Sequence, residues 1–122
     1  MALKILIIED EEIIRSFLQK KLIKEGYDVY IADNADNGLK QIKELKPNLI
    51  LLDIVMPNTG GFQLMEMMEK DGIKGMPVIV ISNSGRPSEI EKARKHGAKD
   101  WIIKTEFDPQ IVIKKVFSQI GK

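Results

Sequence analysis

The chain has 122 residues, no cysteine, and 19 basic against 18 acidic residues. Its length suits one domain with a sizeable core, and the lack of thiols excludes disulfides and thiolate metal sites. The balanced charge, without any Lys/Arg block, argues against nucleic acid as a partner.

The first apolar run, at residues 3–8, turns acidic at Glu9. It is too short and too closely followed by charge for a signal peptide or a membrane span, so we expect a cytoplasmic protein without membrane contact. Five apolar runs predict β-strands, at residues 3–8, 27–32, 48–53, 76–82 and 100–104. The first, third and fourth are apolar almost throughout, which is typical of strands covered on both faces.

Amphipathic segments lie between the predicted strands. The first two have apolar residues at helical spacing, namely Ile13, Ile14, Phe17, Leu18 and Leu22, then Leu39, Ile42 and Leu45. Gly26 indicates the end of the first helix. We also expect Glu11 and Glu12 to act as caps at its start.

Start and stop signals define the later helices. Ser88 and Glu91 form an S-x-x-E capping box, and Gly97 indicates the end of the helix that follows. Asp108 and Pro109 predict an N-cap and a first-turn proline for the last helix.

The alternation of five strands with helical segments predicts an α/β fold. We expect a doubly wound, five-stranded parallel sheet with helices on both faces, in the flavodoxin-like strand order 2-1-3-4-5, forming a single domain over residues 1–122. In such sheets, ligands bind outside the carboxyl ends of the strands, at the point where the strand order reverses.

Polar side chains stand at those carboxyl ends. Glu9 and Asp10 follow the first strand, Asp53 ends the third, Ser82 ends the fourth and Lys104 ends the fifth. In the expected strand order these strands are neighbours, so three carboxylates, a hydroxyl and an amine should converge on one pocket.

Three carboxylates in one pocket call for a cation, because like charges this close do not all ionise easily. Oxygen ligands without histidine or cysteine favour Mg²⁺. One carboxylate then remains as a nucleophile for a phosphoryl group, and the central Asp53 is the best candidate. Lys104 would neutralise phosphoryl charge, and the Ser82 hydroxyl would donate a hydrogen bond.

The stretches "ILIIEDEE", "LLDIVMPNTGG", "VIVIS" and "GAKDWIIK" resemble, in order and spacing, the motifs of the response-regulator receiver domain of two-component signalling. The resemblance implies that Asp53 is the phospho-acceptor, receiving its phosphoryl group from the phosphohistidine of a histidine kinase or a phosphotransfer protein. It implies that Glu9, Asp10 and Asp53, with the backbone carbonyl of Val55, bind Mg²⁺.

The resemblance further implies a switch. Ser82 matches the switch hydroxyl, Lys104 the lysine that contacts the phosphoryl group, and Trp101 the switch aromatic, for which packing alone is the other interpretation. Phosphorylation would change the surface of residues 88–120, which would face a downstream protein or output domain. The chain would be a stand-alone receiver or part of a longer regulator, with only self-phosphorylation and autodephosphorylation chemistry, and not an enzyme with an external substrate.

Departures from the family pattern leave a second hypothesis open. Glu9 stands where Asp is commoner, Gly60 where a polar residue often precedes the turn glycine, and Asn83 where a small residue usually follows the switch hydroxyl. Thr105 replaces the usual proline after Lys104, so we expect a trans bond there, because a non-proline cis bond costs about 2.5–4 kcal/mol. Asn83 and Thr105 would suit a binding module that no longer depends on phosphorylation. For Lys104, the other interpretation is a solvated surface lysine.

An enzyme or redox carrier on the same fold is the third hypothesis. A flavodoxin requires a phosphate-binding loop after the first strand, where "EDEEII" would repel the phosphate of FMN. A haloacid-dehalogenase-type phosphatase requires a second Asp, which "DIVMP" lacks. The sequence therefore favours the receiver over both.

Overall fold

The computed structural model describes residues 2–106 and 108–122. The elements are β1 (Lys4–Ile8), α1 (Glu12–Lys24), β2 (Asp28–Ala32), α2 (Ala35–Leu45), β3 (Leu49–Asp53), α3 (Gly61–Lys70), β4 (Val78–Ser82), α4 (Pro87–Lys95), β5 (Ala98–Ile103), a 3₁₀ turn (Lys104–Glu106) and α5 (Pro109–Ile120). In this part of the chain, no helix has the length and apolar character that crossing a membrane requires.

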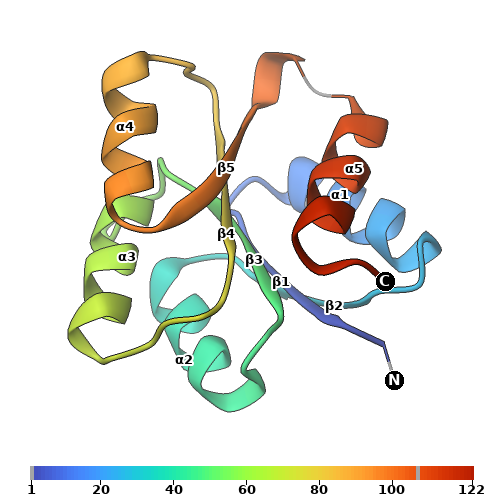
Figure 1. Cartoon of the computed structure of the whole chain (residues 1–122), viewed down its shortest axis with the longest axis horizontal. Helices are drawn as coiled ribbons and strands as arrows, with labels where there is room; N and C mark the ends of the chain where they lie inside the picture. Colours follow the sequence, from blue (N-terminus) through green and yellow to red (C-terminus); the bar gives the residue numbers. More distant parts are fainter. Residues whose placement is uncertain (1, 107) are drawn as a thin grey trace.

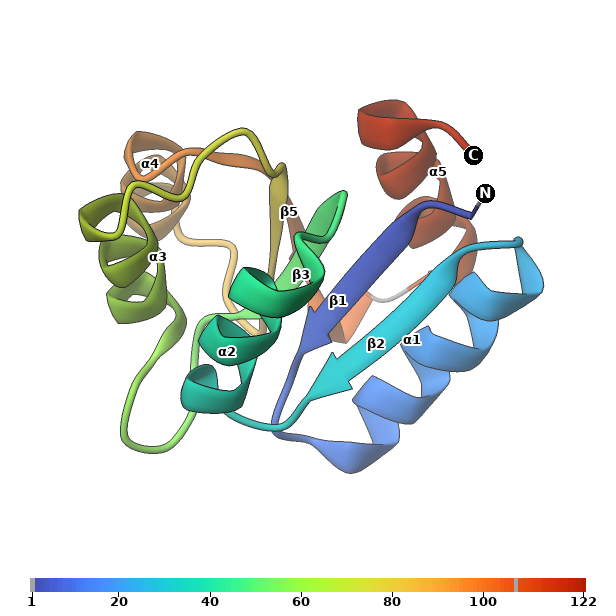
Figure 2. The same ribbon diagram turned by 90° about the horizontal axis from the view of Figure 1, so that it is seen from below.

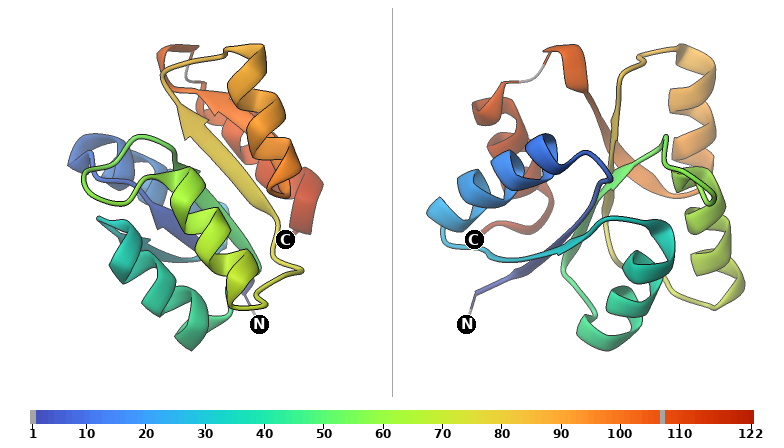
Figure 3. Two further views of the ribbon diagram at one scale, coloured as in Figure 1. Left: turned by 90° about the vertical axis from the view of Figure 1, so that its left-hand side faces the viewer. Right: turned by 180° about the vertical axis from the view of Figure 1, so that it is seen from behind.

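The five strands form one parallel sheet in the order β2-β1-β3-β4-β5, which confirms the predicted topology (Figure 1). Helices cover both faces. Figure 2 and Figure 3 show α1 and α5 on one face and α2, α3 and α4 on the other. The strand ends, rather than the strand faces, are therefore where a ligand can approach the sheet.

Alternating side chains of the strands build two cores. Ile5 and Ile7 of β1 face the α1–α5 side, while Leu6 and Ile8 face the side of α2, α3 and α4. All four are fully buried. Burying one such side chain contributes roughly 1.5–3 kcal/mol, so both faces of the central strands hold the sheet in place.

Three of the predicted helix signals are confirmed, namely the N-cap Asp108 and the stop glycines Gly26 and Gly97. The Asp108 carboxylate accepts a hydrogen bond from the Gln110 N–H at 2.9 Å, as expected of an N-cap. Gly26 and Gly97 follow the ends of α1 and α4 with φ of 97° and 99°, a left-handed conformation that favours glycine.

The predicted capping box at Ser88 is wrong. α4 begins at Pro87, so Ser88 lies inside the first turn. The Ser84 hydroxyl organises this helix start instead, because it accepts a hydrogen bond from the Arg86 N–H at 3.2 Å and donates one to Glu89 at 2.9 Å. The fixed φ of proline suits the first helical position, which moves the helix start ahead of the serine.

The predicted apolar stripe of α1 is only partly buried. Leu18 and Leu22 enter the core, but Ile13 in the first turn is 86% exposed. The helical spacing of the stripe is correct, whereas its N-terminal end faces outward beside the carboxyl edge of the sheet.

Gly61 sets the approach of α3 to the end of β3. Its N–H donates to the Ile54 carbonyl at 2.9 Å. A Cβ at this position would lie 2.6 Å from the Asp53 carbonyl oxygen and 2.9 Å from the Ile54 Cα, both of them backbone atoms that cannot rotate away. The helix can therefore pack against the segment that carries Asp53 only with glycine here.

We predict that Gly61→Ala lowers the free energy of unfolding by about 2 kcal/mol, because the methyl group forces the helix and the strand apart. Denaturant unfolding monitored by circular dichroism measures this change. Lys70→Ala, at an exposed position of the same helix, should stay within about 0.5 kcal/mol of the unmodified protein. Equal stabilities of the two variants would contradict the close approach.

Candidate functional site

The carboxyl edge of the sheet gathers the residues that the sequence indicated. Asp53 ends β3 and pairs with Ile81 of β4, and Ser82 is the next residue of β4. Glu9 directly follows β1. Lys104 stands one residue beyond β5, which ends at Ile103, so the predicted strand end was one residue too late.

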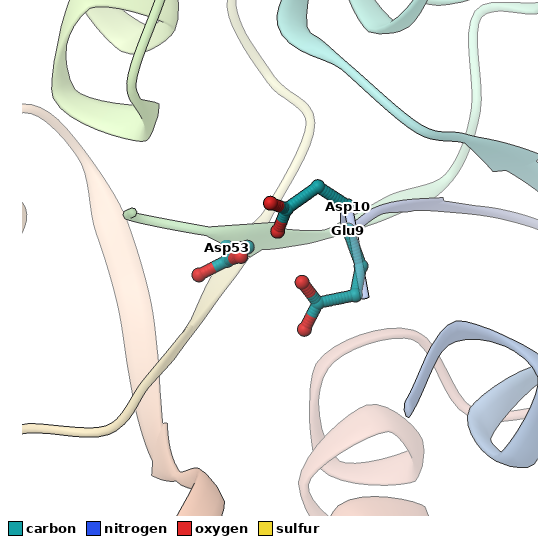
Figure 4. Close-up of side chains that lie close together, drawn as sticks. All are labelled: Glu9, Asp10 and Asp53. Atoms are coloured by element: carbon teal, nitrogen blue, oxygen red, sulfur yellow. The ribbon is translucent and has the colours of Figure 1, made fainter. Parts of the chain in front are cut away.

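Glu9, Asp10 and Asp53 converge at this edge. One carboxylate oxygen from each lies within 4.8 Å of the others, and Figure 4 shows the three side chains turned toward a common space. Glu9 and Asp53 are 0% and 1% exposed. The three carboxylates therefore converge at this edge, as the sequence predicted, with two of them buried.

The oxygen atoms of this cluster fit a divalent cation. Asp53 Oδ1 accepts a hydrogen bond from the Val55 N–H at 3.1 Å. By contrast, Glu9 Oε1 and Asp53 Oδ2 are buried and, within the described residues, accept no hydrogen bond of good geometry. Their contact is an ion pair with the Lys104 ammonium, at 2.8 and 3.2 Å. Buried carboxylate oxygens without a well-aligned donor are the hard ligands that a Mg²⁺ site requires, and here the Lys104 ammonium supplies the positive charge beside them.

Burial and the neighbouring Glu9 carboxylate raise the pKa of Asp53 to about 8, although the positive charge of Lys104 acts in the opposite direction. Both causes disfavour the charged form of a carboxylate. Without a bound cation, the ionised form of Asp53 is therefore disfavoured relative to the protonated form.

Lys104 supplies the positive charge of the site. Its Nζ lies 2.8 Å from Glu9 Oε1, 2.9 Å from Glu11 Oε1 and 3.2 Å from Asp53 Oδ2. The side chain is only 5% exposed, so the alternative of a solvated surface lysine is wrong. The Lys104–Thr105 peptide bond is trans, as expected for a residue that replaces proline, and the lysine still reaches the cluster.

Burial alone would lower the pKa of Lys104, but its contacts with the Glu9 and Glu11 carboxylates and the charge of Asp53 outweigh burial and raise that pKa. The ammonium group therefore stays charged and offsets part of the negative charge around it.

Glu11 is the site residue that the sequence did not identify. It occupies the N-cap position of α1, but within the described chain its carboxylate makes no capping hydrogen bond, so the predicted cap is wrong. The carboxylate accepts a hydrogen bond from Lys104 instead. No local signal predicts this contact, because its two residues are 93 positions apart in the sequence.

Ser84, in the loop between β4 and α4, forms hydrogen bonds with both Ser82 and Trp101. The buried Ser82 hydroxyl accepts a hydrogen bond from the Ser84 N–H at 3.2 Å. The Trp101 indole N–H donates to the Ser84 carbonyl at 2.8 Å. Both predicted switch residues thus bond to one residue of the β4–α4 loop, although a change of their positions stays a prediction.

Comparison with known proteins shows the family of this chain. The sequence profile described as "Response regulator receiver domain" matches residues 5–117. The chain is 30% identical to a CheY-like receiver domain protein from Methanospirillum hungatei JF-1, with a TM-score of 0.88 over 97% of this chain and 93% of that one. A chemotaxis protein from Vibrio cholerae shares the fold, with a TM-score of 0.91 over 98% of this chain and 100% of that one at 22% identity.

A longer relative also matches. The transcriptional regulatory protein AfsQ1 of Streptomyces coelicolor is 29% identical over 100 residues, which are 82% of this chain and 44% of that protein. The chain thus spans less than half of that relative's length. With the profile covering nearly all of the sheet and the acid cluster at its carboxyl edge, the chain belongs to the response regulator receiver domain family.

Proposed function

We propose that the protein is a phosphorylation-activated switch that accepts a phosphoryl group on Asp53 from the phosphohistidine of a sensor histidine kinase or a phosphotransfer protein. The observation that carries the proposal is the position of Asp53, a buried carboxylate between an acidic pair and a buried lysine. No structural role of a strand-end carboxylate requires this combination. The proposed place of action is the cytoplasm.

In the proposed reaction, an oxygen of the Asp53 carboxylate forms a bond to phosphorus while the bond from phosphorus to the donor's imidazole nitrogen breaks. The electron pair of that bond returns to the imidazole ring. Attack of water on phosphorus later releases inorganic phosphate and restores the carboxylate. Because Asp53 is both the acceptor and the group restored, the protein acts on itself and turns over no external substrate.

Mg²⁺ is the proposed cofactor. Glu9, Asp10, Asp53 and the Val55 carbonyl would hold the ion, which when bound neutralises charge on the phosphoryl oxygens. The convergence of the three carboxylates supports this assignment, since two of their oxygens are buried with only the Lys104 ion pair as partner. The Lys104 ammonium would neutralise a further phosphoryl oxygen, and the Ser82 hydroxyl, now an acceptor, would donate to one.

We propose that the signal leaves the site through the β4–α4 loop. If Ser82 turns toward a phosphoryl oxygen, it gives up its bond to Ser84, whose carbonyl holds the Trp101 indole. The loop, α4 and β5 would then adopt the second of two pre-existing arrangements. The α4-β5-α5 face would meet a downstream protein or output domain.

Exposed apolar side chains beside the site support docking of the phosphodonor there. Ile13 and Val55 are both strongly exposed, and Ile13, Ile14, Phe17 and Lys104 line a hollow of about 250 Å³.

The phosphorylation-independent module draws support from Asn83 and Thr105 alone. The close approach of Lys104 to Asp53 opposes it.

We predict that Asp53→Asn stabilises the metal-free protein, and does so more at higher pH. The pKa of Asp53 is about 8 in the folded protein and about 4 in the unfolded chain. The folded state therefore binds more protons between these values, and stability from this group is lost as pH rises through that window.

Thermal unfolding in a chelating buffer at about pH 5 and about pH 8 measures this effect. Asn cannot ionise, so its advantage in melting temperature over Asp53 should be at least about 4 °C larger at the higher pH. Glu12→Gln, at an exposed carboxylate, should show no such growth. A pH-independent difference for Asp53→Asn would contradict the cause given for the raised pKa.

We further predict that beryllofluoride, a phosphoryl analogue, changes the Trp101 fluorescence only when Mg²⁺ is present. Backbone amide NMR shifts should move across α4, β5 and α5 in the same titration. Asp53→Asn should abolish both responses, whereas Asp33→Asn, an exposed carboxylate just after β2, should preserve them. A response that survives Asp53→Asn would refute Asp53 as the acceptor.

A further inference from the structure

We propose that Glu11 is a positioning residue that competes with the phosphoryl group on Asp53 for the Lys104 ammonium and thereby weakens the phosphorylated state. The inference rests on the proposed function and assigns a role to a residue outside the acidic pair. Lys104 makes its well-aligned hydrogen bond, within the described chain, to Glu11 rather than to Glu9 or Asp53.

Three carboxylates share the ammonium group of Lys104. It carries three protons, and three carboxylates lie within 3.2 Å of its nitrogen. With a side chain that is only 5% exposed, water cannot readily substitute for any of them. When Asp53 is phosphorylated, its carboxylate loses its charge, and the proton that faced it passes to a phosphoryl oxygen. The phosphoryl group can receive a second Lys104 proton only if Glu9 or Glu11 gives one up.

Glu11 is the partner that can be released at the lowest cost. Its side chain is 52% exposed, whereas that of Glu9 is 0% exposed. Water can replace the ammonium at an exposed carboxylate, but a buried carboxylate left without its cation carries the full desolvation penalty. Lys104 should thus exchange Glu11 for the phosphoryl oxygen and remain with Glu9.

A backbone hydrogen bond holds Glu11 close to Lys104. The Glu11 N–H donates to Glu9 Oε2 at 3.3 Å, which fixes the start of α1 beside the cluster. Its carboxylate is not engaged in capping the helix. The contact joins the β1–α1 loop to the turn after β5, so its release also frees two loops from each other.

The test compares the affinity for beryllofluoride of Glu11→Gln and Glu12→Gln at saturating Mg²⁺, followed by Trp101 fluorescence. Both variants remove one negative charge from adjacent residues, and Glu12 is exposed in the first turn of α1. We expect Glu11→Gln to bind about three- to tenfold more tightly than Glu12→Gln, because a partly buried charged contact no longer has to be released. Equal affinities, or weaker binding by Glu11→Gln, would overturn the proposal.

A Lys104→Gln background isolates the action through the lysine. There the two glutamine variants should bind beryllofluoride equally, since no ammonium is left to compete for. A difference that persists without Lys104 would show that Glu11 acts by another route, and would also overturn the proposal.

The same variants separate this inference from the proposed function. If the unmodified protein does not respond to beryllofluoride, the proposed phosphorylation-activated switch is wrong. The Glu11–Lys104 contact is then still tested by NMR of the Lys104 ammonium protons in the ligand-free protein. We expect their exchange with water to accelerate in Glu11→Gln and not in Glu12→Gln. Equal exchange rates in both would overturn the role of Glu11.

Discussion

The site depends on one electrostatic constraint, which is the burial of two carboxylates beside a third with a single lysine between them. A parallel sheet brings the carboxyl ends of its strands to one edge, so the last residue of β3 and the residues that follow β1 and β5 meet there without any long loop. The cost of gathering like charges is offset only in part by Lys104. The site is therefore poised to take a cation and an anionic group together, which is the chemistry that a phosphorylated carboxylate with Mg²⁺ needs.

The rest of the fold holds this edge open and fixed. Helices close both faces of the sheet, so the strand ends remain as the accessible surface (Figure 1). Gly61 allows α3 to pack directly against the backbone that follows Asp53. On the other side of the site, Ser84 bonds to both Ser82 and Trp101, so a movement at the phosphoryl position has a short covalent and hydrogen-bonded route to α4 and β5.

The strand order and the acid cluster were predictable because they follow from patterns that the sequence carries locally. Apolar runs mark the strands, the resemblance to receiver domains favours one of the orders that parallel connection rules allow, and the residue at each strand end then falls at a known edge. Three features were not predictable in this way. Ser88 fits a capping box, but Pro87 takes the first position of α4. Ile13 continues an apolar stripe, yet the helix turns it outward.

Glu11 shows the third limit. Its position next to a helix start predicts a cap, but its carboxylate contacts Lys104, which is 93 residues away in the sequence. Such a contact depends on how two loops meet at the sheet edge, which local propensity does not describe. The places of Glu9, Asp53 and Lys104 at strand ends predicted their convergence, whereas the third carboxylate partner, Glu11, could be identified only from the folded chain.

The central claim is that Asp53 becomes phosphorylated. Its most direct test is intact-protein mass spectrometry after incubation with acetyl phosphate and Mg²⁺, followed by treatment with hydroxylamine, which cleaves acyl phosphates. We expect one phosphoryl group to be added, to be removed by hydroxylamine, and to be absent from Asp53→Asn. A phosphoryl group that appears in Asp53→Asn, or that never appears while Mg²⁺ binds, would contradict the account.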